Sequence, residues 1–261
     1  MQYRCLGKTG LIVSEVSFGG HCDEINMNDE KRRVEQIEAG LEGGINLFDI
    51  YENYKQWEPM SKLLHPIRDR VLISLYSAWD ADRVSDEVNY ALRVFKTNYI
   101  DFYRLLIPSK TPEEAETRLS TLLKAKEEGK VKALGVAVHV PSETLAFLRK
   151  HGKELDYIMA PVSYWFPKAL RETEPIAQEI KANNLGVMVM KPLCSHQEGY
   201  HEGTHLFHLK LPTDQLAEFK ARGLTLGKVG LKAMLQSDLV STVTPTMNSV
   251  EEVLENIQAS G

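Results

Sequence analysis

The stretch NLFDIYENYK (residues 46–55) joins a short apolar run to a polar loop. The apolar run ends at Asp49, and Tyr54 follows five positions later. A short apolar run bounded by polar residues is consistent with a buried strand, and polar side chains just beyond such a strand are candidates for a functional site. The stretch therefore predicts a parallel strand that ends in a functional loop, with Asp49 and Tyr54 as its first candidate residues.

Apolar runs of this kind recur along the whole chain, each followed by a loop and an amphipathic stretch. The eight runs are VSFGG (16–20), NLFD (46–49), VLISL (71–75), IDFYRLLI (100–107), ALGVAV (133–138), DYIMAP (156–161), LGVMVM (185–190) and VSTVTP (240–245). The segments between them have helical periodicity; in residues 28–44, for example, Val34, Ile37 and Leu41 share one face. Similar helices are predicted for residues 80–95, 111–130, 142–151, 168–183, 226–236 and 249–259.

Strands and helices that alternate eight times predict an α/β fold with parallel strands, and eight units are what a closed (β/α)8 TIM barrel requires. An open doubly wound sheet would need a GxGxxG loop after its first strand, which SFGGHCDE (17–24) does not provide. The opening YRCLGKTGLIVSEV (3–16) predicts instead an N-terminal β-hairpin with its turn at KTG, which would cover the bottom of the barrel. No linker divides the chain, so residues 1–261 are expected to form a single barrel domain.

Composition argues against several classes of function. The net charge of −5 is not concentrated in basic blocks, so neither nucleic acid nor a membrane surface is an expected partner. Three cysteines far apart, with no CxxC spacing, predict neither a disulfide framework nor a cysteine zinc site. The strongest apolar run, LGVMVMKPL (185–193), is too short to span a bilayer, and the N-terminus lacks the apolar core of a signal peptide. We therefore expect a cytoplasmic protein that acts on a small molecule.

Five motifs in chain order carry a resemblance to a known family. They are LGKTGLIVSEVSFGG (6–20), GGINLFDIYENY (43–54), YIDFYRLLIPS (99–109), GKVKALGVAV (129–138) and PTMNSVEEVLEN (245–256). Together they resemble the aldo-keto reductase superfamily over essentially the whole chain. The resemblance is greatest to the branch with VMKPL (189–193) at the seventh strand.

The resemblance implies an oxidoreductase that binds a nicotinamide dinucleotide across the barrel mouth and passes hydride to a carbonyl. The catalytic tetrad of this superfamily is an aspartate, a tyrosine, a lysine and a histidine, and Asp49 and Tyr54 match the first two. Tyr54 would give its proton to the incipient alkoxide. Because a free phenol has a pKa of about 10, a neighbouring cation and Asp49 are needed to tune and orient it.

The other two positions of the tetrad depart from the superfamily. Tyr76 stands at the end of the third strand in place of the lysine, and Leu106 stands at the fourth strand in place of the histidine. A leucine can neither orient a carbonyl nor stabilise developing charge. The sequence therefore predicts a degenerate catalytic tetrad.

The implied cofactor site is also altered. Ala137 and Val138 replace the polar pair that holds the nicotinamide carboxamide in the superfamily. Glu252 stands where an arginine often binds the 2′-phosphate of NADP, so NADP is disfavoured relative to NAD. Glu255 and Asn256 match the contacts at the adenine end, and the resemblance makes them the predicted cofactor-binding residues.

Charged groups at other strand ends are candidate replacements for the missing residues. Lys191, after the seventh strand, could take over the charge role of the lost lysine or contact the cofactor backbone. His21, Asp23 and His139 could form a new acid/base set, with His21 the first choice; otherwise each is solvated or capped by a backbone carbonyl.

Arg104 shares side-chain parity with Leu106, so both should point into the barrel. A buried arginine needs a partner. We expect an ion pair with Asp49 or Asp101 in preference to a role in binding an anionic substrate.

The segment CSHQEGYHEGTHLFH (194–208) is rich in histidine: His196, His201, His205 and His208. The spacing of His201 and His205 would suit zinc on a helix, but EGT between them argues against a helix and there is no HExxH. We expect no metal, and a lid or pocket wall instead. Aromatic residues after the predicted strands would suit a flat, aromatic substrate, although some must serve packing alone: Tyr51, Tyr54, Trp57, Tyr76, Trp79, Tyr164 and Trp165.

Three functions of different class remain open. The first is a nicotinamide-dependent oxidoreductase acting on a carbonyl or an alcohol. The second is a non-redox enzyme, such as a lyase, dehydratase or isomerase, in which Tyr54, His21 or Lys191 moves protons and no dinucleotide is consumed. The third is a binding protein without turnover, which would expose an apolar patch on one face.

Overall fold

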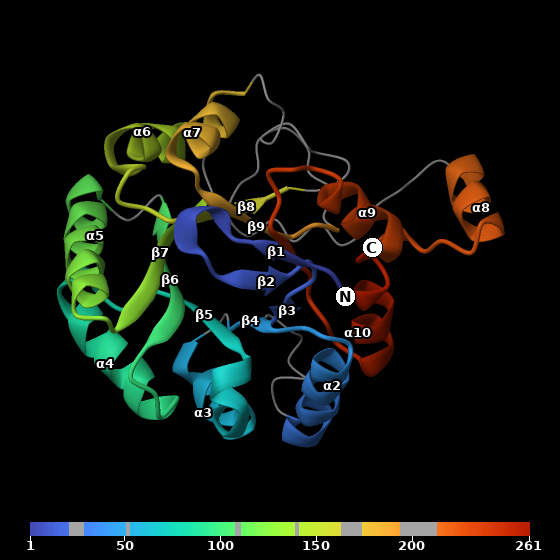
Figure 1. Cartoon of the computed structure of the whole chain (residues 1–261), viewed down its shortest axis with the longest axis horizontal. Coiled ribbons are helices and arrows are strands. Elements are labelled where there is room, and N and C mark those ends of the chain that lie inside the picture. Colours follow the sequence, from blue (N-terminus) through green and yellow to red (C-terminus); the bar gives the residue numbers. More distant parts are fainter. Residues whose placement is uncertain (21–28, 51–52, 108–110, 139–140, 163–173, 194–212) are drawn as a thin grey trace.

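The computed structural model describes residues 1–20, 29–50, 53–107, 111–138, 141–162, 174–193 and 213–261. Within these ranges eight parallel strands form one sheet in chain order, and helices surround it (Figure 1). The strands are β3 (Phe18–Gly19), β4 (Leu47–Asp49), β5 (Leu72–Tyr76), β6 (Ile100–Ile107), β7 (Val131–Val138), β8 (Tyr157–Pro161), β9 (Gly186–Met190) and β10 (Thr242–Thr244). Each overlaps one of the eight apolar runs, so the predicted (β/α)8 barrel is confirmed.

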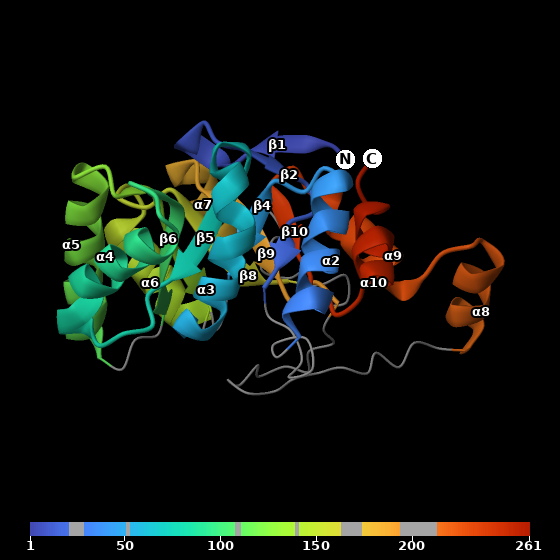
Figure 2. The same ribbon diagram turned by 90° about the horizontal axis from the view of Figure 1, so that it is seen from below.

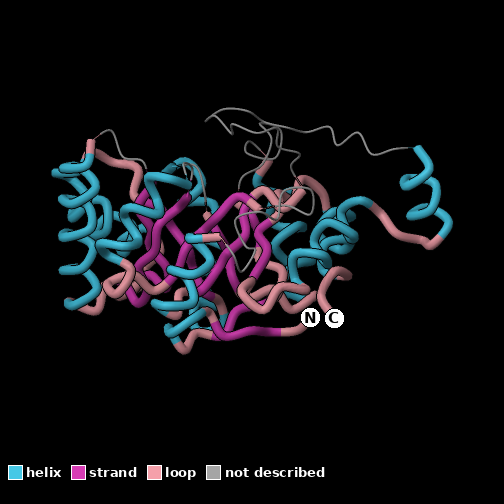
Figure 3. Tube along the Cα trace, turned by 90° about the horizontal axis from the view of Figure 1, so that it is seen from above, coloured by secondary structure: helices cyan, strands magenta, loops and turns pink. Residues whose placement is uncertain are grey.

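The helices are α2 (Glu30–Glu42), α3 (Asn53–Leu64), α4 (Val84–Val94), α5 (Pro112–Glu127), α6 (Pro141–His151), α7 (Pro175–Asn183), α8 (Thr213–Ala221), α9 (Leu226–Leu235) and α10 (Val250–Ile257). Short 3-10 turns lie at Gly7–Thr9, His65–Arg70 and Ala81–Arg83. Two helices are absent from the sequence prediction. α3 contains Pro59, which weakens its helical pattern, and α8 lies apart from the ring of helices around the barrel (Figures 1 and 3). None of the helices in these ranges is both long and apolar enough to cross a bilayer.

Local sequence explains where helices begin and end, as α5 illustrates. The Thr111 side chain accepts a hydrogen bond from the Glu114 amide, and Pro112 occupies the first turn, where no amide hydrogen is needed. Gly129, at φ +75°, follows the end of the helix in a left-handed conformation that costs a glycine little. The helix predicted for residues 111–130 is confirmed.

Apolar side chains form two layers, as alternation along the strands requires. The outer layer lies between strands and helices and includes Phe48, Ile73, Leu105, Val136 and Val189. The inner layer fills the barrel and includes Leu47, Phe102, Ala133, Tyr157 and Met188. The barrel is therefore a packed core whose open end, at the carboxyl ends of the strands, is where a site can form.

A hairpin of β1 (Tyr3–Cys5) and β2 (Ile12–Ser14) lies across the other end of the barrel, beside both chain termini (Figure 2). Leu6 is fully buried there and packs against Gly186, where even a Cβ atom would lie 2.4 Å from Leu6 Cγ. The predicted hairpin and its place at the bottom are confirmed. Its turn is longer than the predicted KTG, because a 3-10 turn and Gly10, at φ +72°, complete it.

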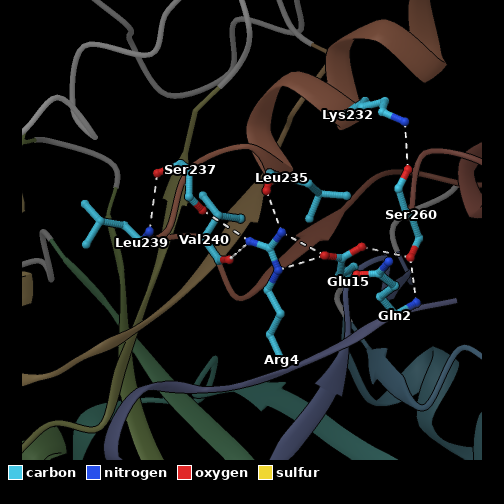
Figure 4. A network of polar contacts seen from close by, with 10 residues as sticks. Gln2, Arg4, Glu15, Lys232, Leu235, Ser237, Leu239, Val240 and Ser260 are labelled. Atoms are coloured by element: carbon cyan, nitrogen blue, oxygen red, sulfur yellow. Dashed lines mark hydrogen bonds and ion pairs between the residues drawn. The ribbon is translucent and has the colours of Figure 1, made fainter.

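Arg4 fastens the hairpin to the last part of the barrel (Figure 4). Its guanidinium donates to the backbone carbonyls of Leu235, Ser237 and Val240, and it pairs with Glu15 at 2.7 Å. Leu235 ends α9, so the arginine binds a carbonyl that has no partner within the helix. This network closes the bottom and leaves the opposite end for function.

Candidate active site

Asp49 ends strand β4 and is held by Arg104 from strand β6. The two carboxylate oxygens accept from the two terminal nitrogens of the guanidinium, Oδ1 from Nη1 at 2.6 Å and Oδ2 from Nη2 at 3.1 Å. Both side chains are buried: Arg104 is 1% exposed and Asp49 5% exposed. The predicted inward orientation of Arg104 and its pairing with Asp49 are confirmed. Asp101, the alternative partner, instead pairs with Arg68 at 2.6 Å.

The strand between them contributes a bridging hydroxyl. Ser74, on β5, donates to Asp49 Oδ1 at 2.7 Å and accepts from Arg104 Nη1 at 2.9 Å. Tyr157, on β8, is completely buried close to Arg104, Asp49 and Ser74. Burial raises the pKa of the Tyr157 phenol, and the Arg104 guanidinium opposes that effect only partly. The result is a polar centre inside an otherwise apolar barrel.

A glycine makes room for this centre. Gly135, on β7, is the register partner of both Arg104 and Tyr157. A Cβ atom at Gly135 would lie 2.6 Å from two ring carbons of Tyr157. The absence of a side chain at this position therefore lets the tyrosine ring and the arginine pack side by side.

The two replaced tetrad positions lie at the ends of strands β5 and β6. Tyr76 is half-buried, is the register partner of Arg104, and has its ring centroid 5.8 Å from Arg104 Cζ. Leu106 is half-buried and packs with the apolar inner layer, as its register partner Ala137 does. The cation next to Asp49 thus comes from β6 rather than from the end of β5.

Tyr54 is in the first turn of α3, so it belongs to a helix and not to the loop that the sequence suggested. Its side chain lies outside the described residues. The same is true of His21, Asp23, His139, Tyr51, Tyr164, Trp165 and the histidine-rich segment 194–208. The structure therefore places Asp49 and the start of α3 together at one strand end and leaves the other acid/base predictions untested.

Lys191 directly follows β9 at the carboxyl end of the barrel, as predicted. It is half-buried and has φ +55°, a left-handed backbone that is uncommon outside glycine. Such conformations concentrate where surrounding structure imposes them, often at functional sites.

The predicted adenine-end residues are on α10. The Glu255 carboxylate is half-buried and accepts from the hydroxyl of Thr225, which caps α9, while Asn256 is buried. Glu252 accepts from the amide of Asn248 at 2.8 Å, and Ser249 caps the helix. The first turn of α10 therefore carries two acidic residues, Glu251 and Glu252.

The residues around the mouth fit the two ends of a nicotinamide dinucleotide unequally. Glu255 offers a carboxylate at the surface to an adenosine hydroxyl or amine. Ala137 and Val138 are buried in the apolar layers and offer no side-chain hydrogen bond to a carboxamide. Met159, on β8, is the register partner of Ala137 and is equally apolar. Within the described ranges, the residues predicted for the adenosine end offer polar side chains, and Ala137 and Val138, predicted for the nicotinamide end, offer none.

A second polar centre, missed by sequence reasoning, lies behind the β5 end. Glu87, on α4, is completely buried and accepts from the Ala78 amide at 2.8 Å, the Trp79 amide at 3.2 Å and the Ser77 hydroxyl at 3.0 Å. Arg118, on α5, donates to Ser77 at 3.0 Å. This carboxylate fixes the backbone that immediately follows Tyr76. The available signal was the position of Glu87 on the same helix face as Val84, Val88 and Ala91.

Two of the aromatic candidates, Trp57 and Trp79, contact Tyr90 on α4. Trp57 is buried between Tyr90 and Phe95, with ring centroids at 5.8 and 6.0 Å, so it serves packing. Trp79 is half-buried against Tyr90, with Arg83 above its ring at 4.8 Å. Among the residues that the structure places, no group of three histidine, cysteine or acidic side chains is arranged to hold a metal ion.

Comparison with known proteins agrees with this fold. The profile of the Aldo/keto reductase family matches residues 15–260. The uncharacterized oxidoreductase YqkF of Bacillus subtilis (strain 168) is 23% identical over 287 residues, which cover all of this chain and 91% of that protein.

Solved structures share the architecture. Aldo-keto reductase AKR11C1 from Bacillus halodurans, in its holo form, has a TM-score of 0.74 at 24% identity, covering 99% of this chain and 90% of that one. An aldo/keto reductase from Klebsiella pneumoniae in complex with NADP and acetate has a TM-score of 0.77 at 19% identity, covering 97% and 88% of the two chains. The chain belongs to the aldo/keto reductase family.

Proposed function

We propose that this protein is an oxidoreductase that uses a nicotinamide cofactor to interconvert a carbonyl compound and an alcohol. The observation that carries the proposal is the Asp49–Arg104 ion pair, a buried pair of charges at the strand end that leads into α3 and Tyr54. Burying two charges costs free energy. The simplest reason for a pair of charges beside the open end of the barrel is chemistry at that end. Family membership gives that chemistry its class.

Tyr54 is the proposed proton donor to the carbonyl oxygen, and Asp49 orients it. A nicotinamide, when bound, supplies the hydride. Lys191 and His21 are the further candidates for charge stabilisation and proton transfer at the mouth. Half-buried Tyr76 and Trp79 at the same end would suit an aromatic carbonyl substrate.

NADH is the preferred form of the cofactor in this proposal. Glu251 and Glu252, in the first turn of α10, would repel the extra phosphate of NADPH. Glu255 is the proposed adenosine contact, beside Asn256. The bound NADP of the Klebsiella structure supports a dinucleotide in this fold but not this preference.

A second candidate function is a non-redox enzyme, such as a lyase, dehydratase or isomerase. The observation that favours it is that Leu106, Ala137 and Val138, which stand in place of polar groups, pack into the apolar layers. In that case Tyr54, His21 or Lys191 would move protons beside a carbonyl, and no dinucleotide would be needed. Both candidates imply a small-molecule substrate, and we propose that residues 1–261 act as one domain in the cytoplasm.

Calorimetric titration with NADH and NADPH tests the proposal. We expect micromolar affinity for NADH and weaker affinity for NADPH. Glu255→Gln should weaken NADH binding by about tenfold, the loss of roughly one charge-assisted hydrogen bond. Glu251→Gln, an exposed acid on the same helix, is the matched control and should leave NADH affinity unchanged.

The absence of binding of either dinucleotide at millimolar concentration would contradict the redox proposal and favour the second candidate. Binding that Glu255→Gln leaves unaltered would support the cofactor but not the proposed adenosine contact.

A further inference from the structure

Asp49 and Arg104 are the charged side chains among the strand residues that face the interior of the described barrel. Their neighbours on the same face are apolar or uncharged, including Leu47, Phe102 and Met159. Each ion is buried and each would be costly without the other. The pair therefore behaves as one electrically neutral unit, placed where strands β4, β5 and β6 approach the open end.

The charge of the Asp49 carboxylate is already balanced by Arg104, and three hydrogen bonds hold the group in place. Both oxygens accept from Arg104, and Oδ1 also accepts from Ser74. A bidentate guanidinium–carboxylate pair fixes the plane of the carboxylate as well as its position. Asp49 is thus oriented by β6, through a side chain that is itself only 1% exposed and so does not reach substrate.

Position 76 lies next to this unit. Asp49 is the register partner of Ser74, and Tyr76 stands one inward step further along β5, beside Arg104. The Tyr76 ring centroid is 5.8 Å from Arg104 Cζ. A long cationic side chain from position 76 and one from position 104 would therefore converge on the same carboxylate.

We propose that Arg104 is the fixed cation of this site and acts as a positioning residue through Asp49, so that the cation has moved from the β5 end to β6. The assignment of a task in proton transfer rests on the proposed function; the location of the cation does not. Arginine stays protonated at any pH at which proteins fold, whereas a lysine would titrate near pH 10. The absence of a lysine at position 76 and the presence of Arg104 are then one change, because a second cation would meet a carboxylate whose charge Arg104 already balances.

A cation swap tests the proposal. Arg104→Met leaves the Asp49 carboxylate buried without its counterion and should lower the melting temperature by about 10 °C. Adding Tyr76→Lys should restore at least half of that loss, because the new ammonium supplies the counterion from β5. The matched control, Arg104→Met with Tyr76→Met, should restore nothing.

The contrary results are equally distinct. The proposal is overturned if Arg104→Met melts like the wild-type protein, or if the lysine double variant melts no higher than its methionine control. Tyr76→Lys alone should bring no rise in melting temperature, and a rise would show that Asp49 can accept a second cation.

A positioning role is separated from a purely structural one by kinetics at 20 °C, with circular dichroism to verify folding. Reduction of an aromatic aldehyde by Arg104→Met should show kcat lowered at least about tenfold with KM nearly unchanged. The lysine double variant should recover kcat. A folded Arg104→Met protein with wild-type kcat would leave only a structural role. If the wild-type protein reduces no carbonyl compound, the proposed function fails, and the melting comparison still decides where the cation of Asp49 resides.

Discussion

At the scale of single residues, Glu87 carries a definite pH dependence. Burial raises the pKa of its carboxyl, and the hydrogen bonds from Ala78, Ser77 and Trp79, with the charge of Arg118, offset this only partly. The folded protein therefore holds this proton more tightly than the unfolded chain does. Stability from this group is greatest below its ordinary pKa of 4.5 and declines as the pH rises from there through the raised folded pKa.

Glu87→Gln should remove this decline. The amide oxygen can accept from the Ala78 and Trp79 amides, and the amide nitrogen can donate to Ser77, so the hydrogen bonds persist. Relative to the wild-type protein, the variant should gain unfolding free energy as the pH rises across that window and keep the gain above it. Urea denaturation at a series of pH values measures this. Glu38→Gln, exposed on α2, is the control and should stay within about 0.5 kcal/mol throughout. If the unfolding free energies of Glu87→Gln and the wild-type protein change with pH in parallel, the prediction is wrong.

For single residues, sequence predicts correctly where the period of a strand determines which way a side chain points. Arg104 lies on the inward side of β6, and a buried guanidinium requires an acid, so pairing with Asp49 or Asp101 could be predicted, and the structure selects Asp49. Glu87 could not be predicted with its partners, because its contacts join α4 to the β5 end and depend on helix packing. The only signal in the sequence was that Glu87 is an acidic residue on the apolar face of a predicted helix.

At the scale of elements, the hairpin depends on Arg4. Arg4→Ala removes donors to three backbone carbonyls at the end of α9 and beyond, as well as the pair with Glu15. Hydrogen bonds from charged groups are worth about 1.5–3 kcal/mol net, so we expect a loss of about 2–3 kcal/mol of unfolding free energy. Chemical denaturation measures it, with Lys31→Ala as control, since Lys31 makes only an exposed pair on α2. A loss below about 0.5 kcal/mol would mean that the hairpin is held by Leu6 and its apolar contacts alone.

Helices and strands could be predicted where the apolar pattern is continuous, and they were missed where the pattern is interrupted. Strands with continuous apolar runs, such as β6 and β9, were located within a residue or two. α3 was missed because Pro59 interrupts its pattern, and the hairpin turn was placed too short because a 3-10 turn leaves little trace in sequence.

At the scale of the whole molecule, eight repeats predicted a barrel but not how the barrel closes. Strands β3 and β10 do not form an extended ladder; they meet through single bridges, Val16 with Val243 and Gly19 with Thr246. Amide–carbonyl hydrogen bonds from Ser17 to Val243 and from Val243 to Glu15 complete the seam. Such a contact between distant parts of the chain depends on backbone proximity, which no local pattern encodes.

Gly19 sets how tightly this seam closes. A Cβ atom there would lie 2.1 Å from the Pro245 carbonyl oxygen, so Gly19→Ala must push β3 and β10 apart. The atoms that the new Cβ would meet belong to the backbone of Pro245 and Thr246 and cannot rotate away. The loss of unfolding free energy should therefore be at the upper end for overpacking, about 3 kcal/mol. Faster hydrogen exchange at the Ser17 and Val243 amides should accompany the loss. Gly40→Ala, on α2, meets no backbone, only the side chains of Ile45 at 3.4 Å and Phe18 at 3.6 Å, and it adds helix propensity, so it should be neutral or stabilising. If both variants unfold alike and the two amides stay protected, closure of the barrel does not depend on Gly19.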